Sequence, residues 1–210
     1  MTEFTKIYIT FISLCRLRLP PNYVNNEFLE FYLMSTETFL NISQIGDAVL
    51  RDSAKPITDV QDKRIQQLID NLISTGKQAN GVGIAAPQVS ESVCLFIVAS
   101  RPNLRYPHAP TMEPTAMINP KIIAHSEEIV KDWEGCLSVP GVRGLVPRYK
   151  TIEVEYIDRN GKECQQQLTD FVARIFQHEY DHLEGILFID RVENPENLIT
   201  EEEYQKRILS

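Results

Sequence analysis

The stretch TDFVARIFQHEYDHLEG, residues Thr169–Gly185, is predicted to form a central helix that decides the fold. Gly185 can end this helix, because glycine readily adopts the left-handed conformation that follows helices. His178 and His182 are four residues apart, so both imidazoles lie on one helical face and can reach one metal ion. Glu179 is rotated about 100° from His178, so its carboxylate can reach a water on the metal without being a ligand. The pattern predicts a hydrolytic metal site.

The alternative is a surface helix in which two histidines fall at this spacing by chance. The chain has only four histidines, so such a pair around a glutamate favours the metal site. A catalytic metal needs a third protein ligand, and the segment WEGCLSVPG, Trp133–Gly141, offers Cys136. One thiolate and two imidazoles form a known ligand set that leaves a position for water. Cys136 could instead be a small buried hydrophobic residue, and the pattern alone leaves both possibilities open.

The composition is typical of one soluble globular domain. The chain has 210 residues, of which 43% are hydrophobic and 24% charged, and its net charge of −8 disfavours non-specific nucleic-acid binding. It contains no run of apolar residues long enough to span a membrane. The four cysteines are scattered without a CxxC pair, which favours a reducing compartment over a secreted disulfide framework.

The N-terminal extension, residues 1–33, differs from the rest of the chain. Ile7–Leu19 is apolar but is broken by two arginines, and it lacks the basic start and cleavage site of a signal peptide. The extension has as many glutamates as basic residues, whereas organelle transit peptides contain few acidic residues. We therefore expect residues 1–33 to be a disordered tail or an upstream misread start. Residues 34–210, beginning at Met34, are expected to form one domain.

Helices and strands are predicted without the regular alternation of parallel α/β folds. Apolar residues recur at helical spacing within Asp59–Asn80, and an apolar run over Val93–Ser100 predicts a buried strand. Alternation within Thr151–Leu168, on either side of Asn160-Gly161, predicts a hairpin.

Two further strands are expected around a turn at Asn119-Pro120, after a proline-rich loop over Arg101–Pro114. The last 15 residues can form a short polar C-terminal helix. The expected fold class is α+β. Mostly antiparallel sheets should pack around the central metal-binding helix, with an N-terminal helix and a short C-terminal helix.

The glycine-rich segment GVGIAAPQV, Gly81–Val89, is not a phosphate-binding loop, because it lacks the pattern GxxxxGK[ST] and does not complete GxGxxG. Its glycines could instead let an extended substrate approach the backbone closely. Gln88 could supply a side-chain amide, although an isolated glutamine is usually a surface residue.

Three stretches together closely resemble the motifs of the peptide deformylase family: GVGIAAPQ (Gly81–Gln88), EGCLS (Glu134–Ser138) and HEYDH (His178–His182). They occur in the family's order and at its separations, and the resemblance covers Phe39–Val192. Many zinc peptidases share HExxH alone, so the combination of the three motifs carries the specificity.

The resemblance implies a metal-dependent hydrolase that removes the formyl group from the N-terminal formyl-methionine of new polypeptides and releases formate. Cys136, His178 and His182 would hold one divalent metal ion. That ion would be Fe²⁺ in the cell, with Zn²⁺, Ni²⁺ or Co²⁺ as substitutes, because soft and borderline ligands suit such metals better than Mg²⁺ or Ca²⁺.

The resemblance also assigns catalytic roles. Glu179 would take the proton of a metal-activated water and pass it to the departing amine. The side-chain amide of Gln88 and the backbone N–H of Leu137 would stabilise the oxyanion of the tetrahedral intermediate.

The implied substrate site accepts an extended peptide that bonds to backbone groups of Val82, Gly83 and Gly135. Phe171 and Ile175 are candidate walls of the methionine pocket. Arg143 matches a family position near the substrate entrance, although it could equally be a solvated surface charge. Asp181 is expected to point away from the metal, where it would either pair with Arg148 or support a metal ligand through a hydrogen bond.

Two other kinds of protein compete with this interpretation. A zinc peptidase normally recruits another His or Glu as its third ligand, so Cys136 argues against one. A structural metal domain needs a fourth protein ligand, and the hairpin position of Cys164 makes it a poor candidate. The implied partner is the nascent formyl-methionyl peptide, with transient proximity to the ribosome, no direct nucleic-acid binding and no membrane. The expected location is cytoplasmic, or an organelle if residues 1–33 are a targeting segment.

Overall fold

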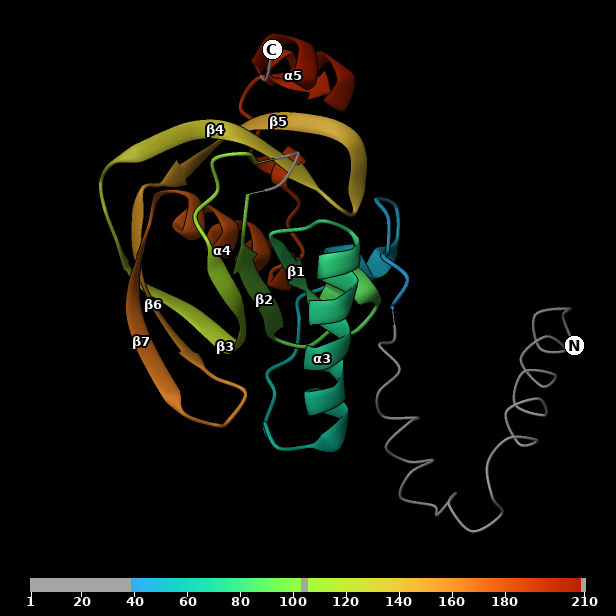
Figure 1. Ribbon diagram of the computed structural model, residues 1–210, viewed down its shortest axis with the longest axis vertical. Helices are drawn as coiled ribbons and strands as arrows, with labels where there is room; N and C mark the ends of the chain where they lie inside the picture. Colours follow the sequence, from blue (N-terminus) through green and yellow to red (C-terminus); the bar gives the residue numbers. More distant parts are fainter. Residues whose placement is uncertain (1–38, 103–105, 209–210) are drawn as a thin grey trace, which may run out of the picture. The chain divides into compact units, whose positions relative to one another are not determined.

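The computed structural model describes residues 39–102 and 106–208, and the predictions on residues 1–33 lie outside this part. The expected α+β architecture is confirmed (Figure 1). A five-stranded antiparallel sheet has the strand order β1-β2-β3-β6-β7, formed by Gly83–Ala85, Leu95–Ser100, Met112–His125, Thr151–Ile157 and Glu163–Thr169. A smaller sheet has the order β4-β5-β8, formed by Ile129–Cys136, Val139–Tyr149 and Leu198–Thr200.

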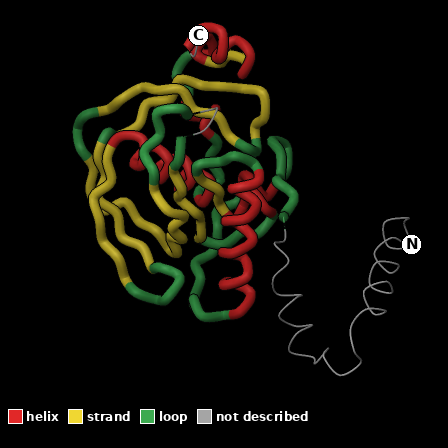
Figure 2. Tube along the Cα trace, in the orientation of Figure 1, coloured by secondary structure: helices red, strands yellow, loops and turns green. Residues whose placement is uncertain are grey.

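The central helix α4 spans Asp170–Leu183, as the sequence predicts, and Gly185 follows it with a φ of +71°. Thr169 occupies the N-cap position without a capping hydrogen bond from its side chain. The apolar face of α4 buries Ile175 and Phe176, and α4 contacts strands of both sheets. Figure 2 shows helices and strands in the orientation of Figure 1, with helical segments among the strands. Helix α4 is therefore held between the two sheets, which fixes the direction of its two histidines.

Helix α3 spans Lys63–Gln78 and is shorter at both ends than the predicted Asp59–Asn80. It begins where it does because the Asp62 side chain accepts a hydrogen bond from the backbone N–H of Arg64 at 2.8 Å. Its apolar stripe is buried against β1 and β2, with Leu68, Ile69 and Leu72 in a second core cluster. Helix α3 thus supports the short edge strand β1 from outside the metal site.

The predicted hairpin is confirmed as β6 and β7, which pair in register from Thr151 opposite Thr169 to Ile157 opposite Glu163. Gly161 has a φ of +85° in the connecting turn, a conformation that glycine adopts without strain.

The predicted turn at Asn119-Pro120 is wrong, because strand β3 runs continuously through this dipeptide. Asn119 adopts a φ of +48° there, and the pairing of β3 shifts register between Ile118 and Lys121. The Asn119 side chain bonds to both backbone groups of Ile57, accepting at 2.9 Å and donating at 2.8 Å. The dipeptide therefore makes a bulge that ties a neighbouring loop to the sheet. Strand β3 also begins at Met112, inside the predicted loop Arg101–Pro114.

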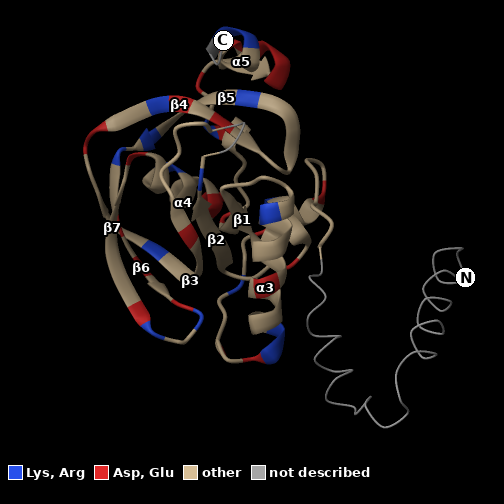
Figure 3. Cartoon of the chain, viewed as in Figure 1, with Lys and Arg blue, Asp and Glu red and all other residues tan. Residues whose placement is uncertain are grey.

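The remaining elements are short. Helix α5, Glu201–Ile208, confirms the predicted C-terminal helix, with acidic residues in its first turn and basic residues in its last (Figure 3). Four 3-10 turns complete the described chain: Ala48–Arg51, Ala86–Val89, Phe188–Arg191 and Pro195–Asn197. Among the described residues, no helix is both long and apolar enough to cross a membrane.

Candidate metal centre

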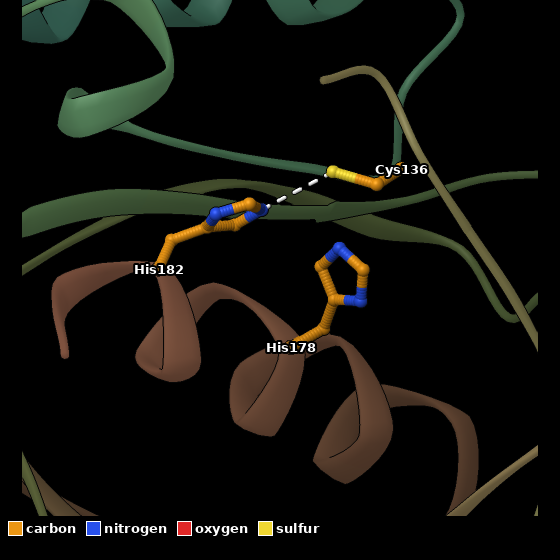
Figure 4. Close-up of side chains that lie close together, drawn as sticks. All are labelled: Cys136, His178 and His182. Carbon is orange, nitrogen blue, oxygen red and sulfur yellow. Dashed lines mark hydrogen bonds between the residues drawn. The ribbon is translucent and has the colours of Figure 1, made fainter. Parts of the chain in front are cut away.

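Three side chains converge at the interface between α4 and the small sheet. His178 and His182 project from consecutive turns of α4, and Cys136 ends strand β4 (Figure 4). Their ligand atoms lie within 4.8 Å of one another, and Cys136 Sγ is 3.2 Å from His182 Nε2. This spacing suits three ligands of a single ion, so the structure brings together the three predicted metal ligands.

Cys136 is placed by a tight connection between β4 and β5. Cys136 pairs with Val139 across a two-residue turn made by Leu137 and Ser138. The backbone N–H of Ser138 donates to Cys136 Sγ at 3.4 Å, which holds the sulfur toward α4. The alternative that Cys136 is only a buried hydrophobic residue does not account for this polar surrounding.

The electrostatic surroundings of Cys136 favour its thiolate. Burial alone would raise its pKa, but His182 and His178 outweigh burial and hold the pKa of Cys136 well below its usual range. The thiolate is the form of cysteine that binds metal ions. One thiolate and two imidazoles fit zinc, iron, cobalt or nickel, and they fit poorly to magnesium or calcium, which bind oxygen ligands.

Glu134, two residues before Cys136, orients the first histidine. Glu134 Oε2 lies 2.8 Å from His178 Nδ1, which leaves Nε2 of that ring to face the metal position. Glu134 is buried, and it accepts hydrogen bonds from Arg148 Nε at 2.9 Å and Arg174 Nη1 at 2.8 Å. Burial would raise the pKa of Glu134, but Arg148 and His178 hold it well below its usual range. A charged carboxylate therefore fixes the ring of His178, the predicted ligand, on the side away from the metal position.

The same network confirms the prediction for Asp181. Asp181 Oδ2 accepts a hydrogen bond from Arg148 Nη1 at 2.6 Å, and Asp181 Oδ1 accepts one from Arg191 Nη2 at 2.7 Å. Arg148 thus joins Glu134 of β4 to Asp181 of α4. These ion pairs fix the helix that carries the histidines against the small sheet.

Replacing Glu134 by glutamine should lower the free energy of unfolding by about 3–5 kcal/mol, because Arg148 and Arg174 would lose a buried charged partner. Denaturant unfolding of the wild type and the variant measures this loss. Glu128 forms an exposed pair with Lys150, so Glu128→Gln serves as the control and should leave stability unchanged. Equal stability of the two variants would show that the Glu134 network contributes little.

Glu179 lies beside the ligands on α4 and is buried. Burial is the main cause that raises the pKa of Glu179 to about 7, although His178 and His182 act in the opposite direction. Within the described residues, Glu179 Oε2 has no hydrogen-bond partner. This carboxylate can therefore exchange a proton near neutral pH.

Gly83 of β1 provides the space that Glu179 occupies. A Cβ atom at position 83 would lie only 2.7 Å from Glu179 Cδ, which is closer than real side-chain contacts allow. Gly83 therefore has a role that the sequence did not reveal, because its missing side chain makes room for the carboxylate.

Replacing Gly83 by alanine should lower turnover by about 10²-fold, because a shift of the Glu179 carboxylate of about 1 Å is costly to catalysis. Steady-state kinetics test this, with metal content and melting temperature measured alongside. In a background that already carries Glu179→Gln, the same change should cost little further activity. A large additional loss there would mean that Gly83 acts independently of Glu179.

The chain matches the family model described as polypeptide deformylase over residues 39–198. The chain belongs to this family. It is 68% identical to peptide deformylase 2 of Nostoc sp. over 169 residues, covering 80% of this chain and 94% of the relative. It is 46% identical to peptide deformylase 2 of Shewanella oneidensis over 164 residues, covering 78% of this chain and 90% of the relative.

Solved deformylase structures share the fold. A class I type b peptide deformylase from Acinetobacter baumannii, crystallised with Met-Ala-Ser bound, superposes with a TM-score of 0.73 at 43% identity. That likeness covers 75% of this chain and all of the other. A peptide deformylase from Synechococcus elongatus in complex with actinonin has a TM-score of 0.67 at 36% identity, covering 77% of this chain and 86% of the other.

In this deformylase, Gln88 is buried beside the ligands rather than exposed. Its Oε1 accepts a hydrogen bond from the backbone N–H of Ala85 at 2.8 Å. Its Nε2 donates to Cys136 Sγ at 3.4 Å and to Ser138 Oγ at 3.2 Å. The amide is therefore fixed with its donor end toward the metal position.

A cavity opens beside the candidate metal centre. Most of the predicted substrate residues line it: Val82, Gly83, Gly135, Phe171 and Ile175. The predicted oxyanion donors Gln88 and Leu137 line it as well. Arg143 is not among the residues that line this cavity. It is fully buried and paired with Glu201, so the alternative that it is a solvated surface charge is wrong.

Sequence reasoning missed several residues of the deformylase site. Glu134 and Arg174 fix His178 and the small sheet, and both line the cavity together with Tyr106 and Trp133. Glu134 begins the EGCLS motif, so a buried acidic residue next to a metal-ligating cysteine was a signal that could have identified it. No comparable local signal marks Tyr106 or Arg174.

Proposed function

We propose that the chain removes the formyl group from N-terminal formyl-methionine of newly made polypeptides and releases formate, with Cys136, His178 and His182 holding the metal. The observation that carries this proposal is the cluster of one thiolate and two imidazoles beside the buried carboxylate of Glu179. Membership of the deformylase family supports the same reaction.

A divalent metal ion is implied by the family, and the three ligand atoms fit it in number, chemistry and spacing. When bound, the ion lowers the pKa of a water molecule toward about 7 and so supplies a nucleophile at neutral pH. We propose Fe²⁺ as the cellular metal, with Zn²⁺, Ni²⁺ or Co²⁺ able to replace it, because this mixed ligand set accepts all four.

Glu179 is the proposed general base and acid. Its unpartnered Oε2 and its pKa of about 7 support a role in taking a proton from the attacking water and delivering it to the departing amine nitrogen. This transfer leaves formate and a free α-amine.

Gln88 and Leu137 are the proposed oxyanion donors. The Gln88 amide already directs Nε2 toward Cys136, and Leu137 follows Cys136 in the turn between β4 and β5. One such donor commonly stabilises a developing oxyanion by about 3–4 kcal/mol.

The substrate is proposed to bind as an added strand. Strand β1 begins at Gly83, directly after Val82, and is at the edge of the five-stranded sheet, so an extended peptide can pair with its free side. Phe171 and Ile175 offer apolar surface for the methionine side chain. The Met-Ala-Ser found with the similar Acinetobacter baumannii protein supports a site for peptides that begin with methionine.

The setting of the reaction is also proposed. The scattered cysteines favour a reducing compartment, which we take to be the cytoplasm. The partner would be the nascent formyl-methionyl peptide close to the ribosome, without direct nucleic-acid binding.

The test is formate release from formyl-Met-Ala-Ser by protein purified without oxygen, with and without a chelator. We expect release that the chelator abolishes and added Fe²⁺ or Ni²⁺ restores. Unformylated Met-Ala-Ser is the matched control, because a zinc peptidase would cleave it whereas a deformylase leaves it intact. Peptide-bond cleavage, or no formate from metal-loaded protein, would contradict the proposal.

A further inference from the structure

Arg143 of β5 is fully buried, which is unusual for an arginine. Its Nε donates to Glu201 Oε2 at 2.6 Å and its Nη2 donates to Glu201 Oε1 at 3.0 Å. Glu201 is the first residue of α5, and Arg143 lies opposite Ile199 where β8 pairs with β5. The bidentate ion pair fixes the guanidinium and the start of α5 relative to each other.

The remaining guanidinium nitrogen reaches a second segment of the chain. Arg143 Nη1 donates to the hydroxyl of Tyr106 at 3.1 Å. The guanidinium carbon is also 5.1 Å from the ring centre of Tyr106 and 4.6 Å from that of Tyr204 on α5. Both distances lie within the range of cation–π attraction. The buried guanidinium of Arg143 therefore binds both Tyr106 and helix α5.

Tyr106 belongs to the wall of the substrate cavity. Its ring centre is 5.0 Å from that of Phe171, and Trp133, which also lines the cavity, packs on Tyr204 at 5.9 Å. These three cavity aromatics are partly exposed, whereas Cys136 and Glu179 are buried. Tyr106 and Trp133 therefore lie nearer the solvent side of the cavity than Cys136 and Glu179, and Tyr106 is next to Phe171, which is proposed to contact the methionine side chain.

We propose that Tyr106 is a specificity-determining residue that contacts the peptide beyond its methionine, and that Glu201 and Arg143 are positioning residues for Tyr106. This inference rests on the deformylase function proposed above. The hydroxyl of Tyr106 is held by Arg143, and Arg143 is held by Glu201, so the ring is ordered before the peptide binds. Pre-ordering a side chain improves affinity because less conformational entropy is lost on binding. The chemical step should not depend on it.

Two variants of the full-length, metal-loaded chain test the inference. Glu201→Gln weakens the hold on Arg143, and Tyr106→Phe keeps the ring but removes the hydroxyl that Arg143 binds. For formyl-Met-Ala-Ser, each should raise KM about 3–10-fold and leave kcat within about twofold, as expected for the loss of one ordered side chain. For formyl-methionine amide, which has no residue after methionine, KM should stay unchanged.

A double variant separates positioning from independent contacts. If Glu201 acts through Tyr106, the two changes together should raise KM no more than the larger single change, because both remove the same hold of Arg143 on the Tyr106 hydroxyl. Glu202→Gln is the matched control, since Glu202 is exposed on the same helix and pairs with Lys206 at 2.6 Å. It should leave KM unchanged for both substrates.

Binding can also be followed without turnover. Trp133 is the only tryptophan of the chain and lines the cavity, so its fluorescence reports the Kd of Met-Ala-Ser. That Kd should rise by the same factor as KM in both variants. Unchanged KM and Kd, additive effects in the double variant, or a fall in kcat at constant KM would overturn the inference. Tyr106→Phe keeps the test decisive if Glu201→Gln fails to fold. Wild-type protein that releases no formate would contradict the proposed function instead.

Discussion

Replacing Glu179 by glutamine should lower kcat by about 10²–10⁴-fold while the metal content stays at the wild-type level. Glutamine has nearly the same shape as glutamate, so it can fill the space beside Gly83 without moving the helix. It cannot accept and return a proton, and the buried carboxylate of Glu179 is placed to do this near neutral pH. The loss should therefore fall on turnover rather than on folding or metal binding.

The measurement is kcat for formyl-Met-Ala-Ser, together with metal content per chain. Glu184→Gln is a suitable control, because Glu184 is exposed at the C-terminal end of the same helix. That control should retain full activity. A Glu179→Gln protein with near-normal formate release would remove Glu179 from the mechanism.

Replacing Cys136 by serine should deprive the chain of both its metal and its activity. A neutral hydroxyl is a poor substitute for a thiolate toward soft and borderline metals. Residues that merely support a metal ligand commonly contribute 10–100-fold to affinity, so the loss of a ligand should exceed about 100-fold. The convergence of Cys136 with His178 and His182 within 4.8 Å is the basis for this expectation.

Equilibrium dialysis against buffered Zn²⁺ or Ni²⁺ measures the affinity directly, and formate release measures the activity. Cys94→Ser is the matched control, because the Cys94 thiol donates to the carbonyl of Ala54 at 3.3 Å and a serine hydroxyl can do the same. The Cys94 variant should bind metal normally. If Cys136→Ser retained full metal and full rate, Cys136 could not be a ligand.

The sequence predicts those elements whose structure is determined by residues close together in the chain. Helix α3 follows from its apolar spacing, the end of α4 follows from Gly185, and the β6–β7 hairpin follows from Asn160-Gly161. The predicted metal ligands each lie within a short motif, and the structure brings their side chains together.

The sequence fails where partners distant in the chain decide the outcome. For Arg143 the sequence leaves a position near the substrate entrance and a solvated surface charge equally open. It does not predict a fully buried ion pair, because Glu201, the partner of Arg143, is 58 positions away. Asn119-Pro120 reads as a turn, but the Asn119 side chain bonds to Ile57, 62 positions earlier, and the strand continues. Glu134 and Arg174 meet across two elements in the same way. Periodicity and short motifs contain no information about such contacts.

Because Gly83 and Glu179 are in close contact, we expect the residues at these two positions to vary together among related sequences. If Glu179 is the catalytic acid, as proposed, we expect selection against a side chain at position 83, because its Cβ atom would clash with the Glu179 carboxylate. A descendant that loses the acid to a smaller residue is released from this constraint and can accept alanine or serine at position 83. Among related sequences, an occupied position 83 should therefore accompany a changed position 179. Such a pair of changes would identify family members that have the same fold but do not catalyse the reaction.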